Sequence, residues 1–161
     1  MTVPSSLQPL LDQGSQDAQT LIDVLCASAA HPRPDADTLD GLYATAMAAL
    51  SRRQFEDAAA AFSVLLALCP EAARSYAGLA HAKRGLGLLD EASVFFALAI
   101  HLDANNLSLR VPLAETLYAM DRKAHAWGLL EQVRVLTLDT PSQAQLHERV
   151  KALQKLFGDV F

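Results

Sequence analysis

Alanines recur every 34 residues along this chain, and each is followed four residues later by a large apolar side chain. The first alanine series and its large partners are Ala58, Ala92 and Ala126 with Phe62, Phe96 and Leu130. A second series lies twelve residues upstream at the same spacing: Ala46, Ala80 and Ala114. Small side chains let two helices cross closely, and large ones fill the space beside the crossing. The period therefore predicts stacked helical hairpins.

Helix and joint patterns divide the chain into three regions. Residues 1–35 read as an N-terminal arm that carries an accessory helix from Gln16 to Ala30, ended by Pro32 and Pro34. Residues 36–138 hold three repeats, 39–70, 73–104 and 107–138. Residues 139–161 form a capping helix and tail. Thr140 is expected to cap this helix, with Pro141 at its first position and Gln143 at its third. The expected fold is all-α: an α-solenoid of three helix hairpins with an accessory helix before it and a capping helix after it.

Local signals refine the expected hairpins. Asp37 or Thr38 is expected to cap the first repeat helix. Gly87 marks the turn of the second hairpin, and Asp121, which tolerates a left-handed backbone, stands at the same place in the third. Arg53 occupies that place in the first hairpin, so we expect this turn to differ in shape. The acid pairs at 56–57 and 90–91 are expected in the first turn of second helices, where they complement the helix dipole.

Composition excludes several classes of partner. The formal net charge of −5 argues against a broad phosphate-binding surface, so we expect no nucleic acid partner. No apolar run approaches the roughly 20 residues that cross a bilayer, and the N-terminus lacks the features of a secretory signal. We therefore expect a soluble cytoplasmic protein without membrane insertion.

Residues with catalytic chemistry are scattered rather than grouped. The five histidines show no metal-ligand spacing with one another or with cysteines and carboxylates. The chain has neither a glycine-rich phosphate loop nor a nucleophile elbow. We expect no catalytic residues, no metal and no cofactor, and a binding protein rather than an enzyme.

The hairpins resemble tetratricopeptide repeats, in which positions two, five, nine and twelve of each first helix line a concave groove. The resemblance implies a partner-peptide site formed by Tyr43, Met47, Leu50, Arg74, Ala77, His81, Arg84, Val111, Glu115 and Tyr118. Such a lining suits an extended peptide with several apolar anchors. In the alternative reading, Tyr43 and Met47 pack as core beneath the N-terminal helix. These two residues also exclude a clamp for heat-shock carboxylates, which needs Lys and Asn at their positions.

More specific motifs resemble the class II chaperones of bacterial type III secretion systems, over about residues 36–138. They are DTLDGLY at 37–43, FEDA at 55–58, and YAGL at 76–79 followed by Gly87. The resemblance implies a cytosolic chaperone that keeps pore-forming translocator proteins soluble before export. It implies a client segment that is extended and has Pro and Leu anchors, and a homodimer formed through the N-terminal helix. Two other readings stay open: a needle-subunit chaperone, and an assembly scaffold of envelope or pilus complexes.

Overall fold

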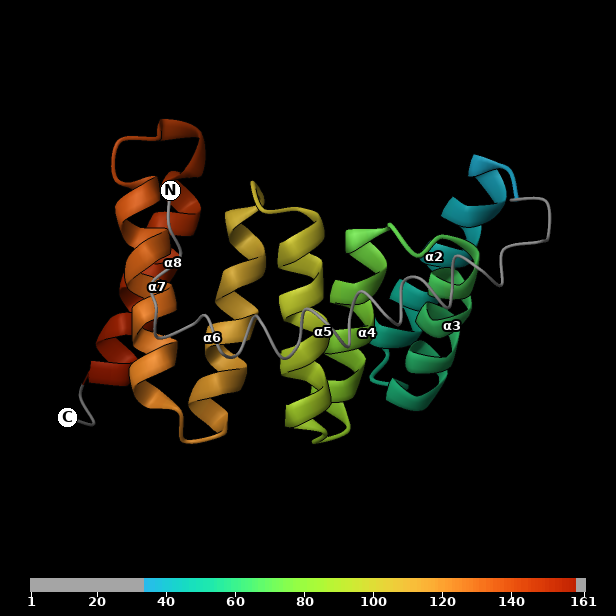
Figure 1. The fold of residues 1–161 in the computed structure, drawn as a ribbon, viewed down its shortest axis with the longest axis horizontal. Coiled ribbons are helices and arrows are strands. Elements are labelled where there is room, and N and C mark those ends of the chain that lie inside the picture. The colour runs from blue at the N-terminus through green and yellow to red at the C-terminus, as the bar shows by residue number, and fades with distance from the viewer. Residues whose placement is uncertain (1–33, 159–161) are drawn as a thin grey trace. The chain divides into compact units, whose positions relative to one another are not determined.

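The computed structural model describes residues 34–158 of the 161, and within that range it contains helices and no strand. The helices pair into hairpins (Figure 1). Their bounds are α2 Ala36–Ser51, α3 Phe55–Leu68, α4 Ala73–Gly85, α5 Leu89–Leu102, α6 Arg110–Ala119, α7 Lys123–Thr137 and α8 Ala144–Gly158. Short 3-10 turns, η1 Leu107–Leu109 and η2 Pro141–Gln143, precede α6 and α8. The predicted fold class is confirmed.

The chain divides into two compact units after Asp103. Unit 1 contains the first two hairpins, α2–α3 and α4–α5, and unit 2 contains the third hairpin, α6–α7, and the closing helix α8. The three hairpins span residues 36–68, 73–102 and 110–137. The N-terminal arm, its accessory helix and the dimer contact predicted for it lie outside the described residues.

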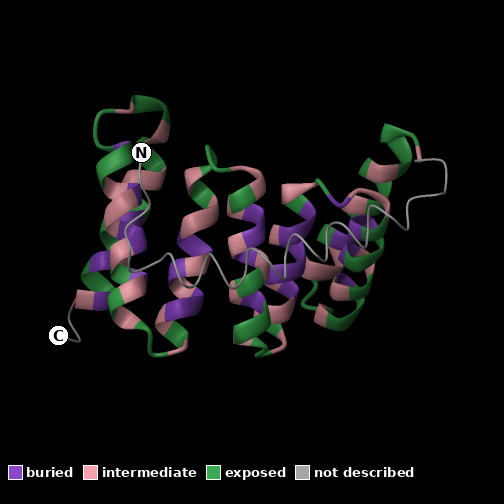
Figure 2. Cartoon of the chain, viewed as in Figure 1, coloured by how far each residue is buried: buried purple, intermediate pink, exposed green. Residues whose placement is uncertain are grey.

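The alanine and aromatic series form the buried layer of each hairpin, as predicted. Six alanines of the two series and their three large partners have no exposed surface: Ala46, Ala58, Ala80, Ala92, Ala114, Ala126, Phe62, Phe96 and Leu130. Buried residues lie along the helix faces that meet within a hairpin (Figure 2). Gly78 of α4 allows the first two hairpins to pack closely, because a Cβ there would overlap the buried ring of Phe62 on α3.

The three hairpin turns have the same conformation. Arg53, Gly87 and Asp121 have φ of 61°, 78° and 60°. In the first hairpin the N–H of Gln54 donates to the carbonyl of Ala49 at 3.0 Å, and that of Arg53 donates to Leu50 at 3.0 Å. The other two turns repeat this pair of bonds, which defines a Schellman ending. The prediction of a different turn at Arg53 was wrong, because the backbone bonds, and not the side chain, set the conformation.

Two predicted helix caps need correction. Helix α2 begins earlier than expected, and its cap is Asp35, whose carboxylate accepts the N–H of Thr38 at 2.8 Å and whose pKa is lowered by that bond. At the start of the closing helix, Thr140 makes no side-chain cap bond, because Pro141–Gln143 form a 3-10 turn closed through the Thr140 carbonyl. The acid pairs do lie in the first turns of α3 and α5, as predicted.

Helix α8 closes unit 2 by packing along α7. Its amide side chain Gln154, which is almost fully buried, donates to Glu131 of α7 at 2.9 Å. Hydrogen bonds from Arg134 and from Gln154 lower the pKa of Glu131 to about 2. A second contact joins α8 to α6, where Arg149 binds Glu115 at 3.0 Å. Residues 115 and 149 are 34 apart, so α8 occupies the place of a first helix in a further repeat.

Candidate peptide-binding face

Seven of the predicted partner-binding residues lie on the first helices of the two hairpins in unit 1. Helices α2 and α4 contact each other directly. The spacing of the predicted residues along each helix puts them on one stripe. We call these two stripes the α2–α4 face: Tyr43, Met47 and Leu50 of α2, with Arg74, Ala77, His81 and Arg84 of α4.

The accessible part of this face is apolar on α2 and polar on α4. Met47 is 40% exposed and makes the most open apolar surface of the face, while Arg74 is exposed beside it. The remaining members, Tyr43, Leu50, Ala77, His81 and Arg84, are half-buried. Tyr43 and Met47 both keep accessible surface among the described residues. The alternative in which they pack beneath the N-terminal helix involves residues outside the described range, so it stays a prediction.

Two side chains from other helices fix the ring of Tyr43. The Arg74 guanidinium lies 4.5 Å from the centre of its ring, in cation–π geometry. The ring meets buried Phe62 edge to face, with centroids 5.8 Å apart. Arg74 is itself bonded to Asp40, one repeat length before it. An exposed pair of this kind contributes little stability. Its effect is to fix the guanidinium over the ring, so that Tyr43 presents one defined orientation.

The other end of the face rests on Phe96 of α5. His81 packs edge to face on this buried ring at 4.9 Å between centroids, and the Arg84 guanidinium lies 5.9 Å from it. Both polar side chains are half-buried and rest on this apolar ring.

The three predicted residues on α6 belong to unit 2, and the structure assigns them other neighbours. Val111 is fully buried, so it offers no surface to a partner and we remove it from the candidate site. Glu115 pairs with Arg149, and Tyr118 stacks on Phe157 with centroids 3.8 Å apart and nearly parallel rings. Both partners lie on α8. The sequence analysis did not predict these contacts. Arg149 lies one repeat length after Glu115, and this spacing indicates that α8 takes the place of a first helix in the next repeat.

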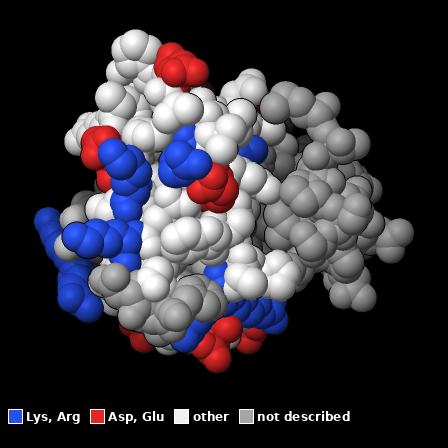
Figure 3. Space-filling view, turned by 90° about the vertical axis from the view of Figure 1, so that its left-hand side faces the viewer, with Lys and Arg blue, Asp and Glu red and all other residues white. Residues whose placement is uncertain are grey.

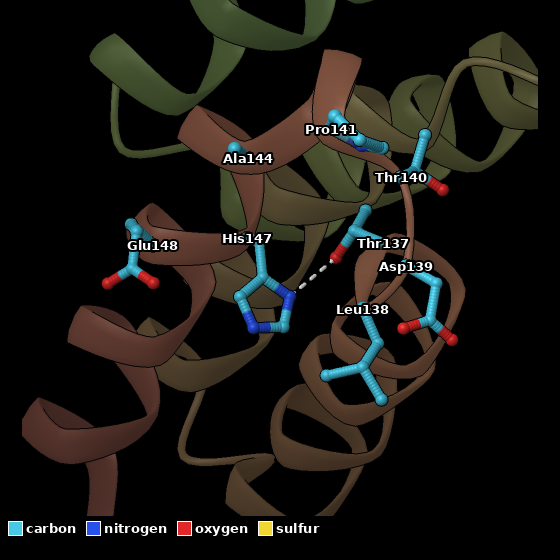
Figure 4. Close-up of a pocket in the computed structure, with 8 residues that line it drawn as sticks. All are labelled: Thr137, Leu138, Asp139, Thr140, Pro141, Ala144, His147 and Glu148. Atoms are coloured by element: carbon cyan, nitrogen blue, oxygen red, sulfur yellow. Dashed lines mark hydrogen bonds between the residues drawn. The ribbon is translucent and has the colours of Figure 1, made fainter.

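A shallow hollow of about 280 Å³ lies where α7 meets α8 in unit 2 (Figure 4). Its centre is the contact of Thr137 Oγ1 with His147 Nδ1 at 3.0 Å. Thr137 also donates to the carbonyl of Val133 at 2.8 Å, so its oxygen accepts from the imidazole. The hollow was not predicted. Its polar contact anchors the start of α8, and we assign it a structural part.

Metal-ligating side chains do not gather into a site within the described residues. Among residues 34–158, no three His, Cys, Asp or Glu side chains come close enough together to hold a metal ion. On the side that carries α7 and α8, the middle is mostly uncharged and Lys and Arg gather along one edge (Figure 3). No helix in the described range has the length and apolar character needed to cross a bilayer.

Solved structures similar to this chain are chaperones of type III secretion. PcrH from Pseudomonas aeruginosa aligns with a TM-score of 0.73 at 24% identity, over 81% of this chain and 98% of that one. SycD from Yersinia enterocolitica, in complex with a peptide of the translocator YopD, gives 0.70 at 24%, over 77% and 95%. PcrH with the chaperone-binding region of PopB gives 0.69 at 25%, over 74% and 96%.

No protein-family model and no curated protein sequence matches the chain. At this level of identity, the likeness to the solved structures establishes architecture. It covers most of both chains. The chain therefore has the tetratricopeptide-like fold of the type III secretion translocator chaperones.

Proposed function

We propose that this protein is a chaperone for pore-forming translocator proteins of a bacterial type III secretion system. It binds an extended segment of its client on the α2–α4 face and works by binding alone, without catalysis. The observation that carries the proposal is an oriented Tyr43 beside an exposed Met47, on a fold whose solved neighbours SycD and PcrH were crystallised with translocator segments.

The α2–α4 face has the elements that recognition of an extended peptide needs. Burial of one Leu-sized or aromatic anchor contributes roughly 1.5–3 kcal/mol. Tyr43, Met47 and Leu50 provide places for such anchors on α2. Arg74, His81 and Arg84 on α4 provide donors for peptide carbonyl groups. Because Tyr43 is already fixed by Arg74 and Phe62, little ordering is required when a peptide arrives.

The proposed task follows from the chemistry of the clients. A translocator carries apolar segments that must stay out of the wrong membrane until export. A chaperone that covers one such segment, and adds its own net negative charge to the complex, opposes aggregation. The proposal places this protein in the bacterial cytoplasm, where clients are made.

Met47→Glu tests the site with little risk to the fold, since Met47 is 40% exposed. The control is Val64→Glu, which adds the same charge at a 52% exposed position on α3. Each tagged chaperone is co-expressed with neighbouring reading frames that encode long apolar segments, then captured and analysed by mass spectrometry. We expect Met47→Glu to weaken client binding at least about tenfold, because a carboxylate replaces an apolar contact.

Circular dichroism should be the same for all three proteins. If Met47→Glu captures as much client as the parent while remaining folded, the client does not bind the α2–α4 face. If the parent protein captures no translocator and leaves co-expressed translocators insoluble, the proposed function is wrong.

A further inference from the structure

The first residues of the chain contain a segment with the chemistry of a peptide ligand. We call residues 4–11, PSSLQPLL, the N-terminal motif. It has two prolines and three leucines, and residues 1–11 include no Asp, Glu, Lys or Arg. Proline fixes φ near the value of an extended polyproline helix, so such a segment loses little entropy when it binds in extended form. The motif precedes the described residues.

The α2–α4 face matches this motif in polarity. Its charged side chains nearest Tyr43 neutralise each other, because Arg74 bonds Asp40. Beside this exposed ion pair, part of the fixed Tyr43 ring and the open side of Met47 are also accessible. Proline-containing extended segments dock on aromatic-lined surfaces of this kind, with spaced side chains as anchors. An uncharged Pro/Leu segment fits this part of the face better than a charged one.

The connection between motif and face is long enough. Residues 12–33 supply 22 residues between the motif and Pro34, which lies just before α2. With residues 16–30 in the predicted accessory helix and the other seven residues extended, they span roughly 45 Å. Helix α2, at 16 residues, is about 24 Å long. The motif of a chain can therefore reach every part of the α2–α4 face of that same chain.

We propose that the N-terminal motif binds the α2–α4 face of its own chain and competes with any other ligand of this face. Tethering gives the motif an effective concentration in the millimolar range, so even an intrinsic Kd of about 100 µM would keep the face occupied about nine-tenths of the time. The apparent affinity of another ligand then falls about tenfold. That this ligand is a translocator rests on the proposed function; the intramolecular docking does not.

Photo-crosslinking in the full-length protein tests the docking directly. The photoreactive amino acid p-benzoylphenylalanine replaces Leu7, and crosslinked peptides are mapped by mass spectrometry in a mixture of light and heavy isotope-labelled chains. We expect crosslinks to residues 36–51 or 73–85 of the same chain, reduced by Met47→Glu and unchanged by Val64→Glu. Crosslinks only elsewhere, only between light and heavy chains, or none at all would overturn the inference.

A second measurement uses a fluorescein-labelled peptide of residues 1–15 as the probe. Its anisotropy is followed with the parent protein and with the double variant Leu7→Asp, Leu10→Asp in the full chain. We expect the probe to bind the double variant about tenfold more tightly, because its own motif no longer occupies the face. Equal affinities would contradict the inference. Co-expression with translocators tests the proposed function separately. The docking of the N-terminal motif can therefore be refuted while the chaperone function is supported, and the reverse is also true.

Discussion

At the scale of single residues, the turn at Arg53 is the most instructive position in unit 1. Its φ of 61° lies in the left-handed region, where a side chain is strained and glycine is not. Gly87 has the same place and the same two backbone bonds in the second hairpin. The fold therefore tolerates a local strain at Arg53 in order to keep the Schellman ending of α2.

Arg53→Gly should relieve this strain. We expect the free energy of unfolding to rise by about 0.5–1 kcal/mol. The variant also loses the weak contact of Arg53 with the Phe55 ring, which offsets a small part of this gain. Gly87→Arg, at the equivalent turn, should lower the free energy of unfolding by a similar amount. Urea denaturation followed by circular dichroism measures both. A lower stability for Arg53→Gly would show that the strain argument is wrong.

At the scale of helices, the contact between α3 and α4 depends on a missing side chain. Gly78 gives the buried ring of Phe62 room to lie against the backbone of α4. Phe62 in turn supports the edge of Tyr43. A single glycine thus connects the packing of the first two hairpins with the orientation of the candidate site.

Gly78→Ala should destabilise unit 1, although alanine is the better helix former. The Phe62 ring has no space to move, and overpacking of this kind costs about 1–3 kcal/mol. Gly41→Ala is the matched control on α2, since a Cβ there meets no atom within 4 Å. The control should gain up to about 1 kcal/mol from helix propensity. If both variants gain stability in thermal denaturation, the packing assigned to Gly78 is incorrect.

At the scale of the whole molecule, the accessory helix at 16–30 is predicted to mediate self-association. Its apolar stripe of Leu21, Ile22 and Leu25 is read from sequence, and one SycD structure is described as an alternative dimer. The homodimer through this helix is therefore still a prediction.

The double variant Leu21→Glu, Leu25→Glu should shift the protein toward monomer, because two carboxylates would enter an apolar contact. Gln16→Glu with Gln19→Glu adds the same charge off the stripe and should leave association unchanged. Sedimentation velocity at several concentrations measures the mass of each protein. Identical concentration dependence of the parent and the stripe variant would exclude this dimer contact.

The amino-acid sequence by itself determined the all-α hairpins and their buried small and large residues. It did so because the 34-residue period places Ala58 or Phe62 and their equivalents at the same local contact each time. The resemblance to tetratricopeptide repeats indicated the stripe that contains Tyr43 and Met47, and its use as a peptide site stays a prediction. These properties depend on residues that are near one another in the chain.

Only the tertiary structure decided what distant residues do to the candidate site. Val111 is buried, and Glu115 and Tyr118 are engaged by α8, a helix whose contacts no local pattern specified. The two side chains that orient Tyr43 also come from other helices: the Arg74 guanidinium over its ring and the Phe62 ring at its edge. Burial and orientation are set by side chains that meet only when the hairpins pack. The resemblance to known repeats therefore indicated the face, and packing determined which of its residues remain accessible.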